Sequence, residues 1–175
     1  AGVTAHGSGS ITLTATEGTL AINAATSSTG GTITLAGDAF EQNANIWTTT
    51  SAISVITDVG MLTMANGTSM ITTTGSITLT AATDLELSYV GSTSGAFVIS
   101  ALGGAIVDNT PDEAVNLSTT GHVTLSAAMN IGGAGDSDID TTITTVEATT
   151  TAGGSINLHE TNGLVVNGTG LRTLA

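Results

Sequence analysis

The sequence contains no cysteine, a single proline, and aromatic residues at only 2% of its 175 positions. Without cysteine the fold contains no disulfide. Aromatic side chains usually supply much of the buried area of a globular core, so a core here must consist of Ile, Leu, Val, Ala and Met. Helix formers other than Ala and Leu are also scarce, since the chain has no lysine, one arginine and one glutamine. These absences favour an all-β fold with a thin core of small aliphatic side chains.

Positive charge is almost absent. Arg172 is the only arginine or lysine, against 14 acidic residues, and the formal net charge is −13. A chain with one permanent cation cannot neutralise a phosphate backbone, which excludes nucleic acid as a partner. The same argument disfavours anionic membrane surfaces. No apolar run approaches the roughly 20 residues of a membrane-spanning helix, so we expect no membrane insertion.

Threonine and glycine, by contrast, are abundant, with 36 and 23 copies. Threonine suits the half-exposed surface of a strand, and glycine marks tight turns. The heptapeptide GSITLTA occurs twice, at Gly9–Ala15 and at Gly75–Ala81. Related segments start at Gly31, Ser51, Gly95, Gly121 and Gly154, so that successive starts lie 22, 20, 24, 20, 26 and 33 residues apart. Most copies alternate apolar and polar residues, which is the pattern of a strand with one buried face.

Each period holds two or three short strands separated by Gly, Asn, Asp or Ser turns, and it has no room for a helix. A β-sandwich of hairpins has no reason to repeat the same letters at this spacing. Stacked coils do, because equivalent positions lie on one another and face the same environment. The sequence therefore predicts an all-β parallel β-helix, or β-solenoid, of about 7–8 coils with roughly 20–26 residues in each.

The register of such a solenoid can be predicted residue by residue. One inward ladder is expected to consist of Ile11, Ile33, Ile53, Ile77, Phe97, Val123 and Ile156. A second is expected to consist of Leu13, Leu35, Val55, Leu79, Ile99, Leu125 and Leu158. The outward column between them is expected to consist of Thr12, Thr34, Ser54, Thr78, Val98, Thr124 and Asn157. Adjacent coils would lie about 4.8 Å apart.

We expect one solenoid domain over residues 1–175, with two interruptions of the repeat. The polar segment Asp38–Asn45 is expected to be an exposed loop between coils. The Gly-, Asp- and Thr-rich segment Gly132–Gly153 is the candidate for a protruding insertion, where function is often found. Neither lysine nor a helix caps an end of the solenoid, and an unprotected edge recruits other strands. We therefore expect self-association of copies, head to tail, into a filament.

The tandem pattern G-[ST]-[IL]-[TN]-L-[TS]-A followed by G-x-L-x-[IM]-x-A is illustrated by Gly9–Ala15 and by GTLAINA at Gly18–Ala24. It resembles the repeats of filamentous-haemagglutinin-like exoproteins, which are large secreted bacterial adhesins folded as right-handed β-helices. The resemblance covers most of the chain. It implies an extracellular or cell-surface location and a structural or adhesive role, with a surface glycan or protein as an unidentified ligand. It brings no catalytic residues with it.

An acidic cluster in GDSDID is the candidate metal site. Asp136, Asp138 and Asp140 are spaced so that alternate carboxylates can converge on a hard cation such as calcium, which takes six to eight oxygens. Glu147 falls at the twelfth position counted from Asp136, where a calcium loop places a bidentate glutamate. In a strand, the same alternate carboxylates would simply share one solvent-exposed face.

Other chemistry is sparse. The sequence has no GxSxG elbow on a strand–turn–helix, and it lacks the basic residues that pectinolytic β-helix enzymes use on polyanions. We therefore expect neither enzymatic activity nor a cofactor, calcium excepted. Three N-x-[ST] sequons, at Asn66, Asn116 and Asn167, are candidates for N-glycosylation.

An alternative function follows from outward threonine pairs. Thr12 with Thr14 and Thr78 with Thr80 have the T-x-T form, and stacked T-x-T rows resemble those of ice-binding β-solenoids. The rows are interrupted at Ser54, Val98 and Asn157. Threonine is also simply a good residue for the surface of a strand.

Overall fold

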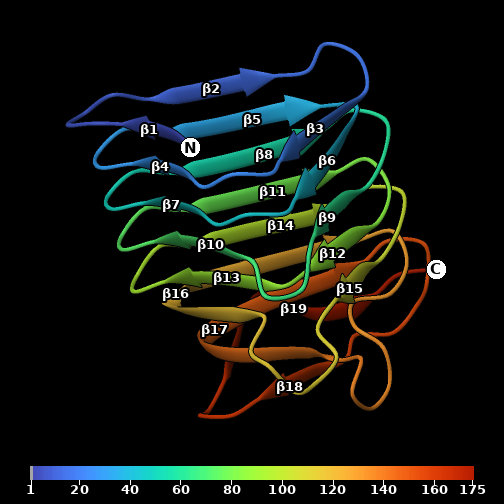
Figure 1. Ribbon diagram of the computed structural model, residues 1–175. Coiled ribbons are helices and arrows are strands. Elements are labelled where there is room, and N and C mark those ends of the chain that lie inside the picture. Colours follow the sequence, from blue (N-terminus) through green and yellow to red (C-terminus); the bar gives the residue numbers. More distant parts are fainter. Residues whose placement is uncertain (1) are drawn as a thin grey trace.

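The computed structural model describes residues 2–175, in which every regular element is a β-strand. The strands pair in parallel and wind into a stack of about eight coils (Figure 1). The prediction of an all-β parallel β-solenoid is therefore confirmed. No helix among the described residues is long and apolar enough to cross a membrane.

Most coils contribute one short strand to each of three faces, which we call faces A, B and C. Face A consists of β2 (Ile11–Thr14), β5 (Ile33–Gly37), β8 (Ile53–Thr57), β11 (Ile77–Ala81), β14 (Phe97–Ala101) and β19 (Val165–Thr173). Face B is a 5-stranded sheet of β3 (Thr19–Ile22), β6 (Ala39–Gln42), β9 (Leu62–Met64), β12 (Leu85–Leu87) and β15 (Ile106–Asp108). Face C consists of β1 (Val3–Ala5), β4 (Thr26–Ser28), β7 (Ile46–Thr48), β10 (Ser69–Thr72), β13 (Tyr89–Ser92) and β18 (Leu158–Glu160). Two long strands, β16 (Leu117–Ala127) and β17 (Ile139–Thr150), run from face C into face A and join these faces into one 14-stranded sheet.

The predicted ladders on face A are confirmed over their first six positions. Ile11 pairs with Ile33, and the column continues through Ile53, Ile77, Phe97 and Val123. The second inward ladder and the outward column follow the same pairs in register. Residues some 22 positions apart therefore do lie on one another, as the repeat predicts.

At the seventh position of each column the prediction is wrong. Val123 stacks on Val146 and Leu125 on Ala148, with Glu147 outward between them. The predicted members are on other faces: Ile156 bridges Ile131 on face B, and Leu158 pairs with Ile139 on face C, so the placement of Asn157 is also wrong. The reason is that all three faces require the same inward–outward alternation, so the pattern alone does not assign a strand to a face.

The two expected interruptions are also largely wrong. Within Gly132–Gly153, the residues Ile139–Thr150 form strand β17, which lies in the sheet with alternating buried side chains. Only residues 132–138 form a loop that leaves the coil. Within Asp38–Asn45, the residues Ala39–Gln42 form β6, where Phe40 and Gln42 are fully buried. The Gln42 side chain is accommodated because its Nε2 donates to the Ser69 carbonyl at 2.8 Å.

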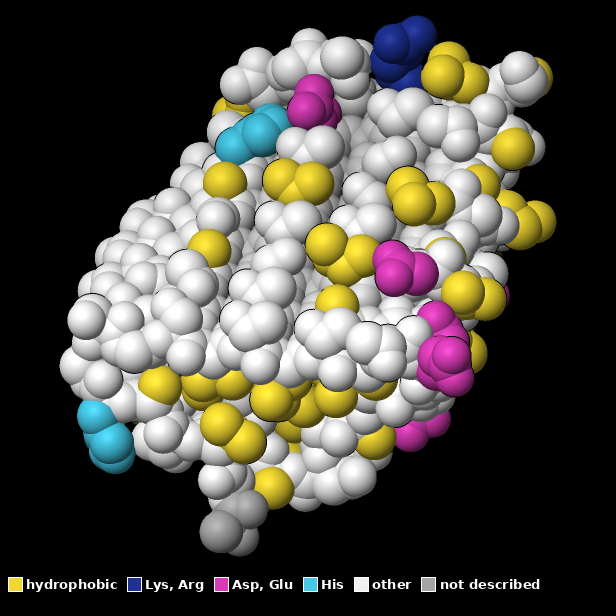
Figure 2. All heavy atoms as spheres, turned by 90° about the horizontal axis from the view of Figure 1, so that it is seen from above, with side chains coloured by type: hydrophobic (Ala, Val, Ile, Leu, Met, Phe, Trp, Pro, Cys, Tyr) yellow, Lys and Arg dark blue, Asp and Glu magenta, His cyan; other side chains and the backbone are white. Residues whose placement is uncertain are grey.

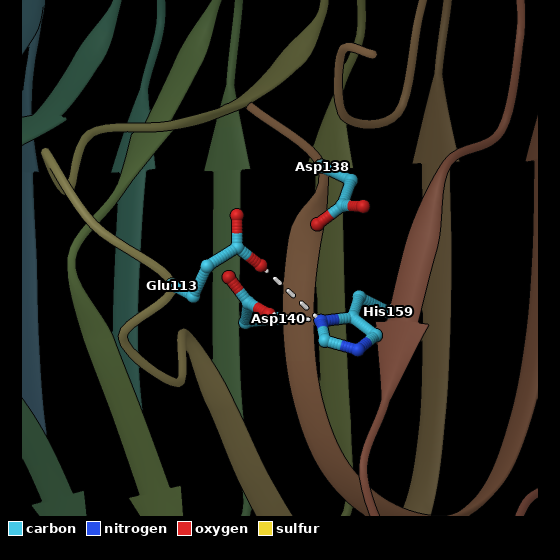
Figure 3. Close-up of side chains that lie close together, drawn as sticks. All are labelled: Glu113, Asp138, Asp140 and His159. Carbon is cyan, nitrogen blue, oxygen red and sulfur yellow. Dashed lines mark hydrogen bonds and ion pairs between the residues drawn. The ribbon is translucent and has the colours of Figure 1, made fainter. Parts of the chain in front are cut away.

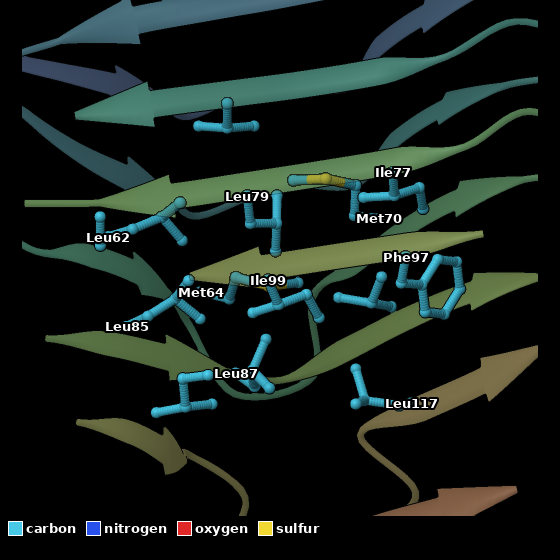
Figure 4. Packing of buried hydrophobic residues seen from close by; sticks show 14 of the residues in the cluster. Leu62, Met64, Met70, Ile77, Leu79, Leu85, Leu87, Phe97, Ile99 and Leu117 are labelled. Carbon is cyan, nitrogen blue, oxygen red and sulfur yellow. The ribbon is translucent and has the colours of Figure 1, made fainter. Parts of the chain in front are cut away.

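A continuous column of aliphatic side chains fills the interior (Figure 4). Face A contributes alternate residues such as Ile77 and Leu79, while faces B and C contribute Leu62, Met64 and Met70, all without solvent exposure. Burial of one such side chain stabilises the fold by roughly 1.5–3 kcal/mol. The repeated aliphatic positions of the sequence are thus the main source of stability.

A row of buried hydroxyl groups joins the coils at the corner between faces C and A. Thr72 Oγ1 donates to the Ser51 carbonyl of the preceding coil (3.2 Å) and accepts the N–H of Gly75 in its own coil (3.0 Å). Two coils further on, Thr119 Oγ1 makes the equivalent pair of bonds, donating to the Gly95 carbonyl (2.7 Å) and accepting the Gly121 N–H (2.9 Å). Ser28, Thr48 and Ser92 occupy the same place in other coils. The row satisfies backbone groups that the turn would otherwise bury without partners.

The glycine that opens the heptapeptide is required by close approach of the coils. A Cβ at Gly95 would lie 1.7 Å from the Gly75 carbonyl oxygen, and one at Gly75 would lie 1.9 Å from the Ser51 oxygen. Gly31 meets the Gly9 oxygen in the same way, at 2.0 Å. The recurrence of glycine at this position in the sequence is therefore a packing requirement.

Both ends of the stack present strand edges. At the first coil, β1, β2 and β3 each pair on one side only among the described residues. These strands surround an apolar hollow of about 290 Å³ lined by Val3, Leu13 and Leu20 among others. Figure 2, which views the molecule from this end, shows apolar atoms gathered in a band near the lower edge, while most of the remaining surface is neither apolar nor charged. At the last coil, β18 and β19 are the outer strands, and Val165, Val166 and Leu171 are exposed.

Candidate functional site

Two long loops set the position of the candidate site. In the first coils the turn from face B to face C is short, at residues 23–25 and 43–45. Two later coils replace this turn by the longer loops 109–116 and 132–138, in adjacent positions along the stack. Both loops carry carboxylates, so stacking of the coils brings acidic residues from separate parts of the sequence together.

Four side chains meet beside these loops (Figure 3). Glu113 belongs to the loop 109–116, Asp138 ends the loop 132–138, Asp140 lies in β17, and His159 lies in β18. One ligand atom of each lies within 4.8 Å of those of the other three. His159 Nδ1 is 2.8 Å from Asp140 Oδ1 and 3.3 Å from Glu113 Oε2.

The backbone holds Asp140 and His159 in place. Asp140 pairs directly with His159 in the parallel register of β17 and β18. Asp140 is only 3% exposed, and its N–H donates to Asn116 Oδ1 at 2.9 Å. The Asn116 amide in turn donates to Asp108 Oδ1 at 2.6 Å. The centre of the cluster is therefore fixed by strand pairing and by buried hydrogen bonds rather than by free side chains.

The electrostatics of the cluster favour the uptake of positive charge. Burial raises the pKa of Asp138, and the neighbouring carboxylate of Asp140 raises it further. Burial, followed by Asp140 and Asp136, raises the pKa of Glu113. The hydrogen bond to Asp140 raises the pKa of His159, against a smaller effect of desolvation. Burial is thus the main cause for the two carboxyl groups, with the neighbouring carboxylates second, whereas Asp140 is the main cause for the imidazole.

Two carboxylate oxygens in this region are buried without a partner. Asp138 Oδ1 and Asp108 Oδ2 have almost no contact with solvent and accept no hydrogen bond from the described residues. A buried charged oxygen with neither a donor nor a cation is costly. Of these two residues, Asp138 belongs to the cluster of four.

The structure brings together part of the predicted calcium set. Asp138 and Asp140 lie in the cluster, and Asp136 is close enough to Glu113 to affect its pKa. Glu147 does not join them, because it lies at the other end of β17 on face A. There Glu147 Oε2 accepts the N–H of Thr169 at 2.9 Å and so holds a bulge in β19.

Sequence reasoning missed Glu113 and His159. Neither stands near Asp140 in the sequence, and only the register of β17 against β18 makes His159 its neighbour. The lengths of the loops 109–116 and 132–138 are the signal that points to this corner.

The three sequons differ in accessibility. Asn66 and Asn167 are exposed. Asn116 is fully buried, and both its amide nitrogen and its oxygen are used in hydrogen bonds to neighbouring coils. A glycan on Asn116 is therefore incompatible with this fold, which corrects the expectation for that residue.

A shallow groove of about 450 Å³ runs along face C. Its walls carry hydroxyl groups from successive coils, including Ser118, Thr120 and Thr142, together with Tyr89. The Tyr89 ring lies over Gly91, where a Cβ would stand 2.7 Å from the ring. The groove therefore combines one aromatic surface with rows of hydroxyl donors and acceptors.

Comparison with protein-family models, with curated proteins and with solved structures finds no match to this chain. The class that the structure itself defines is the parallel β-solenoid.

Proposed function

We propose that the chain is a rigid segment of an extracellular surface fibre, extended head to tail by further copies of itself. The observation that carries this proposal is the open first coil, where three strand edges surround an apolar hollow rimmed by Val3, Leu13 and Leu20. Unpaired strand edges recruit other strands, and burial of the hollow adds a hydrophobic contribution. The role is mechanical rather than catalytic.

The last coil offers matching chemistry. On face A the inward columns end in Val166, which pairs with Val146, and in Leu171, which pairs with Ala148. A second copy placed in register would lay Ile11 and Leu13 over these positions and continue both aliphatic ladders. A contact between two identical ends would stop at a dimer. A contact between the last coil of one copy and the first coil of the next leaves both outer ends free to add further copies.

The secreted and adhesive parts of the proposal rest on the repeat pattern and on face C. The tandem pattern resembles that of filamentous-haemagglutinin-like adhesins. The groove along face C supplies a contact surface for a surface glycan, because ligand sites combine aromatic side chains with a few convergent polar groups. Its members Tyr89, Ser118 and Thr142 come from consecutive coils.

The filament is tested at the edge of β2. Ile11 and Ala15 donate their N–H groups inward, to Thr32 at 2.8 Å and Ala36 at 2.9 Å, so the N–H of Thr12 between them faces the open end. Thr12→Pro removes this outward donor without breaking an inward bond. We expect sedimentation velocity and negative-stain microscopy to show filaments for the parent chain and for the control Thr12→Val, and short species for Thr12→Pro. A parent chain that sediments as a monomer at all concentrations would sink the proposal.

Ice binding is a second candidate because the structure contains a regular threonine column. Thr49, Thr73, Thr93 and Thr120 occupy one corner of successive coils and are joined by backbone hydrogen bonds of 2.9, 2.9 and 3.2 Å. Three of the four side chains are exposed. Thermal hysteresis in the parent chain that Thr93→Lys abolishes would favour this function, and its absence in the parent chain eliminates it.

A further inference from the structure

The cluster of Glu113, Asp138, Asp140 and His159 has a donor set that a merely acidic surface lacks. Three carboxylates are combined with one imidazole nitrogen, and the side chain of the central Asp140 is 4% exposed. Each residue comes from a different place in the stack: the loop 109–116, the loop 132–138, β17 and β18. Strand pairing fixes two of the four donors relative to each other.

We propose that these four residues bind one divalent transition-metal ion, with zinc as its representative. Two ligands of a tetrahedral zinc ion at about 2.0 Å are about 3.3 Å apart. His159 Nδ1 lies 2.8 Å from Asp140 Oδ1 and 3.3 Å from Glu113 Oε2, so these three atoms are already close to the separation that a shared ion requires. The ion would replace the hydrogen bond that joins His159 Nδ1 to Asp140 Oδ1.

The buried oxygen of Asp138 is an independent indication of a cation. Asp138 Oδ1 is closed off from solvent and accepts no hydrogen bond from the described residues. In Figure 3 the Asp138 carboxylate lies beside the other three groups, within 4.8 Å of their ligand atoms. Burying such an oxygen without a partner is unfavourable, and coordination to an ion removes that penalty.

The donor set selects the class of ion. Imidazole suits zinc and the other late first-row metals, whereas calcium takes six to eight oxygens, many of them from carbonyls and bidentate glutamates. The four protein donors here include one nitrogen, and Glu147, which a calcium loop would have used, lies on another face. Zinc with four protein ligands is typical of a structural rather than a catalytic site.

A bound ion would join the last coils of the stack to one another. Glu113 lies in a loop that leaves the solenoid, and His159 lies in β18 at the outer edge of the stack. An ion held between them and Asp140 connects the loop to the next two coils of the stack.

Zinc titration by calorimetry tests the proposal on the whole chain. We expect one ion per chain, at least tenfold weaker binding in Asp138→Asn and His159→Gln, and nearly unchanged binding in the matched controls Asp58→Asn and His122→Gln. Asp138→Asn keeps the shape of the side chain, which makes no hydrogen bond with the described residues, so loss of binding is not a folding defect. Hydrogen exchange should show zinc-dependent protection of residues 109–116 and of β18.

Three results would each overturn the proposal. The parent chain binds no zinc at micromolar concentrations; the Asp138 and His159 variants bind as well as their controls; or calcium protects the same segments as strongly as zinc does. The filament assay on Thr12→Pro is separate from these measurements, so the metal site and the proposed function fail independently.

Discussion

Replacement of Thr72 by valine tests whether the buried hydroxyl row holds the coils together. Thr72 is 1% exposed, and its hydroxyl group accepts the Gly75 N–H at 3.0 Å and donates to the Ser51 carbonyl at 3.2 Å. Valine has the same branched shape and strand preference but neither bond. The substitution therefore removes the hydrogen bonds and leaves the packing almost unchanged.

The loss in the free energy of unfolding follows from the polar groups that Thr72→Val leaves without partners. A buried N–H without an acceptor costs about 1–3 kcal/mol, and the lost bond to the carbonyl adds about 1 kcal/mol. The extra methyl group of valine in an apolar corner offsets about 1 kcal/mol of this. We expect a net loss of about 2 kcal/mol in the free energy of unfolding. For a chain of this size that corresponds to a fall of about 4–8 °C in the melting temperature.

Urea unfolding followed by circular dichroism measures the effect, with Thr73→Val as the matched control. Thr73 is the next residue, is exposed, and keeps its backbone bonds on substitution. An exposed change of this kind is expected to alter stability by less than about 0.5 kcal/mol. If Thr72→Val and Thr73→Val are equally stable, the hydroxyl row does not hold the coils and the reasoning is refuted.

Three further predictions concern other elements of the stack. Gly95→Ala places a Cβ 1.7 Å from the Gly75 oxygen, so we expect a loss of at least about 3 kcal/mol in chemical denaturation; a stable variant would show that the coils can separate locally. The pKa of Glu147 is lowered chiefly by a backbone N–H of the last strand, so its stabilisation is present above the unfolded pKa of about 4.3 and is lost as the pH falls through the lower folded value. Between about pH 6 and pH 3, the melting temperature of Glu147→Gln should therefore fall less with pH than that of the parent chain. An equal fall in both proteins would contradict this. Asn116→Ala should lower the melting temperature by several degrees because it leaves buried partners unsatisfied, whereas Asn66→Ala in an exposed turn should not; equal effects would argue against the buried role of Asn116.

The face A ladders were predictable because their strands repeat the same alternation of apolar and polar residues. Each repeat also begins with a glycine or a serine. The coil containing Val146 was missed since its strand is preceded by Thr144 and Thr145 and has no such residue. The later segment GSINLHE has the expected letters but belongs to faces B and C. The sequence pattern predicts which side chains point inward, but it does not predict on which face of the coil they lie.

The candidate site was predictable in part for a related reason. The close spacing of Asp138 and Asp140 is visible in the sequence, whereas the approach of Glu113 and His159 depends on how coils of unequal length stack. Glu147 was included because the spacing of a calcium loop presumes a compact turn. In an extended strand the same spacing carries the residue to a different face.

The direction of the ladder hydrogen bonds has a mechanical consequence. On all three faces these bonds run along the axis of the stack, so each coil is attached to the next by several bonds that share a load. A pull on one terminus acts on the outermost coil alone, and the coils detach in sequence rather than together. Each one that leaves releases roughly 20–26 residues, or about 70–90 Å of extended chain. The molecule thus lengthens in steps under tension, with its remaining coils intact.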